Sequence, residues 1–224
     1  MDANLIVMLT HHDRTTPDAL EVFHTASDLA IDFWGFKDVG LSEAKMSELA
    51  TALHRAHKKV FLEVVSYTES ECLRGAHLAV DLKCDYLMGT IFYRKVWDYI
   101  KDTDVTYLPF LGNVSGSPSI LEGTPEELID EGMRYIDLGV TGFDILAFRH
   151  VTDPESIASA CARQIPGTIV IAGSIASKER MQFVDNIGAW GFTMGSALFD
   201  DAFVANGGFR SNLEAVTSLM SDIV

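Results

Sequence analysis

The fold is decided by residues 168–199, which read TIVIAGSIASKERMQFVDNIGAWGFTMGSALF. This stretch contains a short apolar run, a turn with Gly173-Ser174, an amphipathic segment, a second apolar run and a second turn with Gly195-Ser196. Short apolar runs of this kind are typical of strands covered on both faces, and the amphipathic segment is typical of a covering helix. The stretch therefore predicts two consecutive strand–helix units of a parallel sheet.

The same alternation continues towards the N-terminus. The strand-like runs are Leu5–Leu9, Leu29–Phe36, Val60–Val65, Tyr86–Met88, Val105–Leu111, Phe143–Ala147, Thr168–Ala172 and Gly191–Met194. Helix start signals follow most of them, at Thr16-Pro17-Asp18, Ser42-Glu43, Thr68–Glu71, Thr124–Glu127, Asp153-Pro154-Glu155 and Ser177-Lys178-Glu179, with further helices expected at Tyr93–Lys101 and Asn212–Ile223. Eight strand–helix units in 224 residues predict an α/β protein with a single (β/α)8 barrel, a TIM barrel, over residues 1–224.

The charge of the chain restricts its partners. There are 32 acidic and 17 basic side chains, so the formal net charge is −15. A surface this acidic repels nucleic acid and anionic membranes at long range, and we expect neither as a partner. A small anionic substrate must then be held by local groups, namely backbone amides and a few cations.

The cysteines and the N-terminal segment suggest a compartment. Cys72, Cys84 and Cys161 are far apart and odd in number, which fits neither a disulfide framework nor a zinc site. No stretch has the roughly 18 apolar residues of a membrane span, and the first residues do not resemble an export signal. We therefore expect a cytoplasmic location without membrane attachment.

The two glycine–serine turns are the strongest functional signal. In a (β/α)8 barrel the active site lies at the C-terminal ends of the strands, and the loops after strands seven and eight often bind phosphate. Gly173 and Gly195 let the backbone present N–H groups to a ligand, and a short extra helix from Ala197 would add free amides. Alternatively, both glycines simply make tight barrel turns.

The segments IAGSIASKERM and GAWGFTMGSALFDDAF resemble the C-terminal quarter of the ribulose-phosphate-binding barrels, which include histidine-pathway ribotide isomerase and phosphoribosylanthranilate isomerase. The resemblance implies that Gly173, Ser174, Gly195 and Ser196 bind a substrate phosphate. It covers about 50 residues closely, and elsewhere only the rhythm of eight strand–helix units agrees. The double glycine usual after strand seven is here Gly173-Ser174.

Candidate chemical groups follow the first three strands. His11 and Asp13 lie in a polar run at the end of strand one, where they are expected to act as acid or base, unless the run is a solvated loop. Lys37 ends strand two and is a candidate for contact with an anionic group or for a Schiff base, although the adjacent Asp38 favours its protonated form. Glu63 is the one charge in an apolar strand, so it needs a partner, and Lys37 on the neighbouring strand is the natural one.

Further candidates lie in the second half of the chain. Arg149 and His150 end strand six, and Arg149 is the better candidate to bind phosphate or a carboxylate. Asp144 lies early in the same strand, which favours a core role. The polar segment 112–123 follows strand five and is expected to be either a lid or an ordinary flexible connection.

The leading hypothesis is an enzyme that isomerises a small phosphorylated metabolite, a sugar phosphate or ribotide, by proton transfer. His11, Asp13, Lys37 and Glu63 are its catalytic candidates, with no cofactor required. A lyase or aldolase is the nearest alternative; it would use Lys37 as a Schiff base or a divalent metal held by His11, Asp13 and Glu63. A non-catalytic barrel that senses a phosphorylated metabolite also remains open. Phe199, Phe203 and Phe209, expected to be exposed, are candidates for a homo-oligomer contact.

Overall fold

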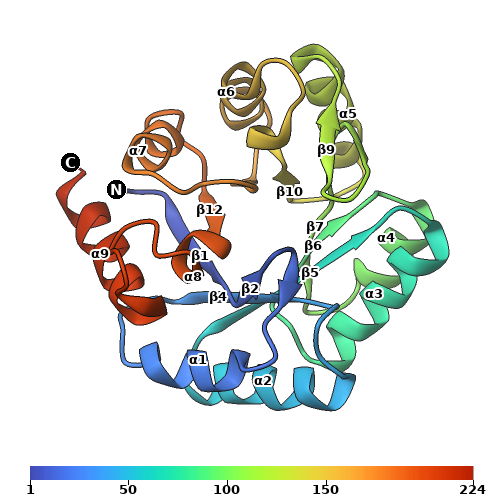
Figure 1. The fold of residues 1–224 in the computed structure, drawn as a ribbon. Helices are drawn as coiled ribbons and strands as arrows, with labels where there is room; N and C mark the ends of the chain where they lie inside the picture. Colours follow the sequence, from blue (N-terminus) through green and yellow to red (C-terminus); the bar gives the residue numbers. More distant parts are fainter. Residues whose placement is uncertain (224) are drawn as a thin grey trace.

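The computed structural model describes residues 1–223 and is a (β/α)8 barrel (Figure 1). Its parallel strands follow the order β10-β11-β12-β1-β4-β5-β6-β7 around the ring. They are β1 (Asn4–Met8), β4 (Phe33–Lys37), β5 (Lys59–Ser66), β6 (Tyr86–Thr90), β7 (Thr106–Leu108), β10 (Gly142–Ile145), β11 (Thr168–Ile171) and β12 (Gly191–Met194). An isolated bridge between Phe110 and Asp144 joins the two end strands and nearly closes the barrel. The fold class predicted from the sequence is confirmed.

Helices surround the strands, as Figure 1 shows. They are α1 (Ala19–Ala26), α2 (Glu43–Arg55), α3 (Glu69–Asp81), α4 (Arg94–Ile100), α5 (Pro125–Asp137), α6 (Pro154–Gln164), α7 (Lys178–Asn186), α8 (Ser196–Phe199) and α9 (Gly208–Asp222), with a 3₁₀ turn η1 (Ala147–Arg149). Side-chain oxygens of Ser42, Thr68, Thr124, Asp153 and Ser177 cap five of them, at the start signals identified in the sequence. The short extra helix expected after the eighth strand is α8.

Three predicted element boundaries are wrong by several residues. The second strand begins at Phe33 because the chain from Leu29 still turns at the end of α1, where the N–H of Leu29 donates to the carbonyl of Ala26 (3.1 Å). The fifth strand ends at Leu108, where Pro109 follows and has no N–H to donate to a ladder. The last helix begins at Gly208, four positions before its predicted start.

Aromatic side chains close the N-terminal end of the barrel. The rings of Phe61 and Tyr86 stack with centroids 4.1 Å apart, and Phe33 packs edge-on against Trp190 at 5.1 Å. All four residues lie within or next to the first halves of their strands. Because this end is filled by large side chains, a ligand cavity has to lie at the C-terminal ends of the strands.

Two short hairpins stand at that C-terminal end. One pairs β2 (Thr10–His11) with β3 (Arg14–Thr15), and the other pairs β8 (Asn113–Ser115) with β9 (Ile120–Glu122). The second hairpin lies in the segment 112–123, for which the sequence predicted either a lid or a flexible connection, so part of this segment is a paired structure. Both hairpins project from strand ends and so add walls to the barrel mouth (Figure 1).

The three phenylalanines near the C-terminus do not form the exposed apolar surface that we expected. Phe199, Phe203 and Phe209 are each half-buried. The rings of Phe199 and Phe209 lie 4.9 Å apart, and Phe209 also packs against Trp34. This expectation from the sequence is therefore wrong, because the three rings pack within their own chain.

The remaining sequence expectations concern cysteines and membrane spans. Cys72, Cys84 and Cys161 are free and buried. Within residues 1–223, no helix combines the length and apolar character needed to cross a bilayer.

Asn212 organises the connection between α8 and α9. Its side chain is fully buried, and its Oδ1 accepts hydrogen bonds from the N–H groups of Phe203 and Val204, both at 2.9 Å. Its Nδ2 donates to Asp201 Oδ1 (2.8 Å) and to the carbonyl of Gly208 (2.9 Å). One amide thus satisfies buried donors and acceptors along the whole connection.

We predict that Asn212→Ala lowers the free energy of unfolding by about 2–6 kcal/mol, because two backbone N–H groups lose their acceptor at a cost of about 1–3 kcal/mol each. Urea unfolding followed by circular dichroism measures the change. Asn186→Ala is the matched control, since Asn186 is exposed at the end of α7 and its loss should cost less than about 0.5 kcal/mol. Equal losses in the two variants would contradict the role given to Asn212.

Candidate active site

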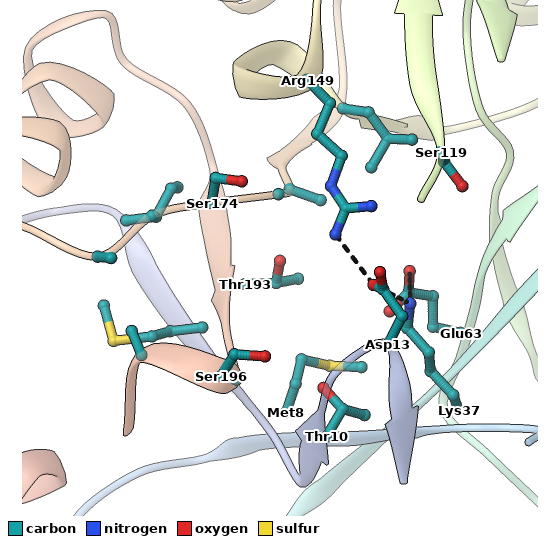
Figure 2. A pocket seen from close by; sticks show the side chains of 18 of the residues that line it. Met8, Thr10, Asp13, Lys37, Glu63, Ser119, Arg149, Ser174, Thr193 and Ser196 are labelled. Carbon is teal, nitrogen blue, oxygen red and sulfur yellow. Dashed lines mark hydrogen bonds and ion pairs between the residues drawn. The ribbon is translucent and has the colours of Figure 1, made fainter. Parts of the chain in front are cut away.

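A cavity of about 470 Å³ opens at the C-terminal ends of the strands. Its lining brings together eight of the nine site residues predicted from the sequence: Asp13, Lys37, Glu63, Arg149, Gly173, Ser174, Gly195 and Ser196. Figure 2 shows Ser174 and Ser196 on one side of the cavity and Lys37 with Glu63 on the other. The ninth residue, His11, lies outside the lining.

The β2–β3 hairpin carries Asp13 over the barrel mouth. His12 (φ 49°) and Asp13 (φ 59°) form its two-residue turn in the left-handed region, which aspartate and histidine enter more readily than most side chains. The hairpin is fixed to β4, because the Thr15 hydroxyl donates to the carbonyl of Lys37 and accepts from its N–H, each at 2.8 Å. This pairing places Asp13 beside the Lys37 side chain.

Lys37 lies between two carboxylates. Its Nζ is 3.1 Å from Asp13 Oδ1 and 3.2 Å from Glu63 Oε1. Lys37 and Glu63 are direct partners in the β4–β5 register, so the ion pair expected from neighbouring strands is confirmed. The same Asp13 oxygen accepts from Arg149 Nη2 at 2.9 Å, and the network therefore runs from Arg149 through Asp13 and Lys37 to Glu63 (Figure 2).

The network sets the charges of its members. Burial lowers the pKa of Lys37, but the charges of Glu63 and Asp13 outweigh this effect and leave the pKa above its usual value. For Asp13, burial raises the pKa, but the hydrogen bond from Arg149 and the charge of Lys37 together lower it by more. The pKa of Asp13 therefore lies below its usual value. At neutral pH, Lys37 is therefore an ammonium and Asp13 a carboxylate.

Asp144 is a buried carboxyl group close to this network. It is fully buried, and neither of its carboxyl oxygens has a hydrogen-bond partner within residues 1–223. Burial and the charge of Glu63 raise its pKa well above the usual value, against the opposing charges of Lys37 and Arg149. The core position expected from the sequence is correct, and burial there favours the protonated form of the side chain.

The two glycine–serine turns form the opposite side of the cavity. Gly173 (φ 85°) and Ser174 (φ 57°) both have positive φ, and a Cβ on Gly173 would lie 3.1 Å from Cγ of Arg149. A Cβ on Gly195 would lie 2.6 Å from the hydroxyl oxygen of Thr10, so glycine lets this turn approach the end of β1. Close packing therefore favours glycine at position 195, and the positive φ favours it at position 173.

Backbone amides in these turns are available to a ligand. The N–H groups of Ser174, Ile175, Ser196 and Ala197 have no backbone acceptor among the described residues. Free amides that converge on a cavity bind oxyanions without needing a net positive charge nearby. The turns can therefore hold an anion in a protein whose net charge is −15.

Arg180 is a further cation of the lining that the sequence reasoning missed. It belongs to the first turn of α7, directly after the Gly173-Ser174 turn. Its Nη1 donates to the carbonyl of Ser174, and its guanidinium lies 4.7 Å from the ring centroid of Phe148. The sequence feature that could have predicted Arg180 is its position as a basic residue in the first turn of the helix that follows the Gly173-Ser174 turn.

His11 lies outside the cavity lining and pairs with Asp200. Its Nε2 lies 2.8 Å from Asp200 Oδ1, and its ring stacks on His12 at 3.8 Å. Among residues 1–223, no three His, Cys, Asp or Glu side chains gather in a way that would hold a metal ion. The three metal ligands suggested from the sequence, His11, Asp13 and Glu63, do not come together. Lys37 lies between Asp13 and Glu63, and His11 pairs with Asp200.

Comparison with known proteins identifies the fold. No family model matches the chain, and no curated protein matches it. Orotidine 5′-phosphate decarboxylase from Pyrococcus horikoshii OT3 has a TM-score of 0.69 at 12% identity, covering 98% of each chain. A structure described as native KDPGal has a TM-score of 0.67 at 13% identity, covering 99% of this chain and 98% of that chain.

Thiamine phosphate pyrophosphorylase from Pyrococcus furiosus is similar to the same degree. Its TM-score is 0.66 at 10% identity, and the match covers 100% of this chain and 98% of that chain. Because the identities are this low, the likeness concerns the course of the backbone. These comparisons independently support the (β/α)8 barrel that the strand order shows.

Proposed function

We propose that this protein is an enzyme that isomerises a small phosphorylated metabolite, a sugar phosphate or ribotide, by proton transfer. One observation carries the proposal: a single cavity has the glycine–serine turns with their free amides on one side and the Lys37–Glu63 pair on the other. Arg149 and Arg180 also line this cavity. Two similar structures, orotidine 5′-phosphate decarboxylase and thiamine phosphate pyrophosphorylase, are named after phosphorylated compounds. Their names support this substrate class.

The phosphate end consists of the two glycine–serine turns with Arg149 and Arg180. α8 is a single turn of four residues, so it contributes its free N–H groups rather than a long helix dipole. Arginine matches a phosphate with paired donors, and hydrogen bonds to charged groups contribute about 1.5–3 kcal/mol each. These local groups offset the repulsion from the acidic surface.

Glu63 and Lys37 are the reacting end. The Glu63 carboxylate removes a proton from the hydroxyl-bearing carbon next to the substrate carbonyl and returns it to the carbonyl carbon. The proton of that hydroxyl passes to the former carbonyl oxygen, so the hydroxyl-bearing carbon becomes the new carbonyl. The Lys37 ammonium stabilises the negative charge that develops on the carbonyl oxygen in between. Asp13 is bound by two cations, so we assign it to orienting Lys37, and His11, which lies outside the lining, to supporting Asp200.

An aldolase or lyase that uses Lys37 as a Schiff base is the alternative. It needs a neutral amine, and the charges of Glu63 and Asp13 raise the pKa of Lys37. The resting network therefore favours proton transfer over covalent catalysis. A barrel that only senses a phosphorylated metabolite would bind phosphate without turnover.

The phosphate end generates the first functional prediction. Arg180→Ala should raise the Kd for inorganic phosphate roughly five- to thirtyfold, because a charge-assisted contact of about 1–2 kcal/mol is lost. Isothermal titration calorimetry measures the change. Arg163→Ala removes the same charge from an exposed position on α6 and serves as the matched control, which should bind phosphate like the unmodified protein. Identical Kd values for both variants would exclude Arg180 from the phosphate site.

Glu63 and Lys37, the reacting end of the cavity, generate the second functional prediction. Glu63→Gln and Lys37→Met should each lower deuterium uptake from heavy water by aldose and ketose phosphates by roughly 100-fold or more, the usual contribution of a positioned acid or base. Phosphate affinity should change less than about threefold, because these side chains lie across the cavity from the turns. Lys59→Met is the control, since Lys59 is exposed at the other end of β5.

Two results would favour the alternatives instead. Borohydride trapping of a carbonyl substrate on Lys37 would establish the aldolase chemistry. Phosphate binding by the unmodified protein without deuterium uptake or turnover of any sugar phosphate would favour the sensor.

The raised pKa of Asp144 generates the third prediction. The folded pKa of Asp144 lies above that of the unfolded chain, so the folded state retains a proton that the unfolded state releases. Stability is therefore lost as pH rises above the unfolded value, by at most about 1.4 kcal/mol per pH unit. Asp144→Asn removes this proton, and urea unfolding from pH 5 to 8 should show a flatter dependence for the variant. Parallel curves would mean that Asp144 is ionised in the folded protein.

A further inference from the structure

A second cavity of about 350 Å³ lies between the two hairpins. It shares Asp13, Lys37, Val65 and Ser119 with the first cavity, so the two spaces lie next to each other. Pockets that enclose small ligands typically measure 300–1,000 Å³, and together the two cavities lie within that range. A ligand with its phosphate at the glycine–serine turns can therefore continue past Lys37 into the second space.

The walls of this second cavity are held in place on both sides. The Tyr67 hydroxyl donates to the carbonyl of Gly116 (2.9 Å) and lies 2.7 Å from Ser119 Oγ, which ties the β8–β9 hairpin to the end of β5. On the other side, Leu121 forms a bridge with His150, whose Nε2 lies 2.9 Å from the carbonyl of Gly123. These contacts hold the hairpin against the end of β5 and against η1, next to the second cavity.

The lining of the second cavity combines hydroxyl groups with two carboxyl groups and two cations. Hydroxyls come from Tyr67, Ser117 and Ser119, and a half-buried carboxyl comes from Asp38. Burial raises the pKa of Asp38 to about 6, although the charge of Arg74 opposes the change. A carboxyl group with a pKa near neutrality can accept hydrogen bonds from hydroxyl groups or donate to them.

The charges of the lining argue against a second phosphate. The charge of Lys37 is already balanced by Asp13 and Glu63. The other basic residues that line this cavity are Arg14 and His12. Asp13 and Asp38 both line this space, and their negative charges would disfavour a second anion there. Uncharged hydroxyl groups suit these mixed donors and acceptors better.

We propose that the second cavity binds the hydroxylated carbon chain of the substrate, with Asp38 as the residue that recognises its hydroxyl groups. The inference rests on the proposed function and narrows its substrate class: the substrate is a polyol or sugar phosphate whose chain extends beyond three carbons on the far side of Lys37 from the phosphate. Tyr67 is a positioning residue, because it acts by holding the hairpin wall.

Three probes with the same phosphate end test the inference by calorimetry: inorganic phosphate, glycerol 3-phosphate and ribitol 5-phosphate. Ribitol 5-phosphate should bind at least tenfold tighter than glycerol 3-phosphate. Asp38→Ala should reduce this advantage to less than threefold and leave the Kd of the two shorter probes unchanged. Asp104→Ala, which removes an exposed carboxylate before β7, is the matched control and should keep the full advantage.

Three outcomes would overturn the inference. Equal affinity of the unmodified protein for glycerol 3-phosphate and ribitol 5-phosphate would exclude a chain-binding site. Equal weakening of all three probes by Asp38→Ala would assign Asp38 to the phosphate end. Tenfold tighter binding of ribitol 1,5-bisphosphate than of ribitol 5-phosphate would make the second cavity an anion site.

Failure of the underlying function gives a different result. If the unmodified protein does not bind inorganic phosphate, the proposed function fails and this inference fails with it. If phosphate binds but chain length has no effect, the inference alone is wrong. Tyr67→Phe provides a second variant: it should weaken ribitol 5-phosphate and leave inorganic phosphate unchanged, as expected when the hairpin wall loosens.

Discussion

The barrel mouth depends on one buried ammonium held between two carboxylates. Lys37 is buried, and an uncompensated charge in that position would be costly, so Asp13 and Glu63 must be close to it. With Arg149 on Asp13, the network contains two cations and two anions. Burial is the main reason that the pKa of Asp144, close to this network, is raised, and the negative charge of Glu63 adds to the effect.

This charge balance also organises the segments around the mouth. Lys37 and Glu63 come from adjacent strands, whereas Asp13 reaches them from a hairpin turn and Arg149 from η1. The bonds between Thr15 and the Lys37 backbone fix the hairpin that carries Asp13. Four separate segments of the chain are therefore tied together above the strands, while aromatic rings fill the opposite end.

The sequence was most informative where a feature depends on repeated burial. Apolar runs revealed the strands, and an isolated charge in such a run revealed the Glu63–Lys37 pair. Features that depend on individual backbone angles were not predicted: the left-handed turn at His12 and Asp13 aims Asp13 inwards, and only the folded hairpin shows that His11 points to Asp200. Arg180 was missed because its position depends on how α7 follows the Gly173 turn.

Arg149 connects the two functions proposed for the cavity. Its guanidinium donates to Asp13, and its aliphatic part lies against Gly173, so it touches both the charge network and the phosphate turn. A phosphate that draws the guanidinium towards the turn would leave Asp13 with Lys37 as its remaining cation. Asp13 would then attract Lys37 more strongly and loosen its hold on Glu63, the proposed base. In the proposed mechanism, Arg149 would therefore link phosphate binding to the readiness of Glu63 to accept a proton.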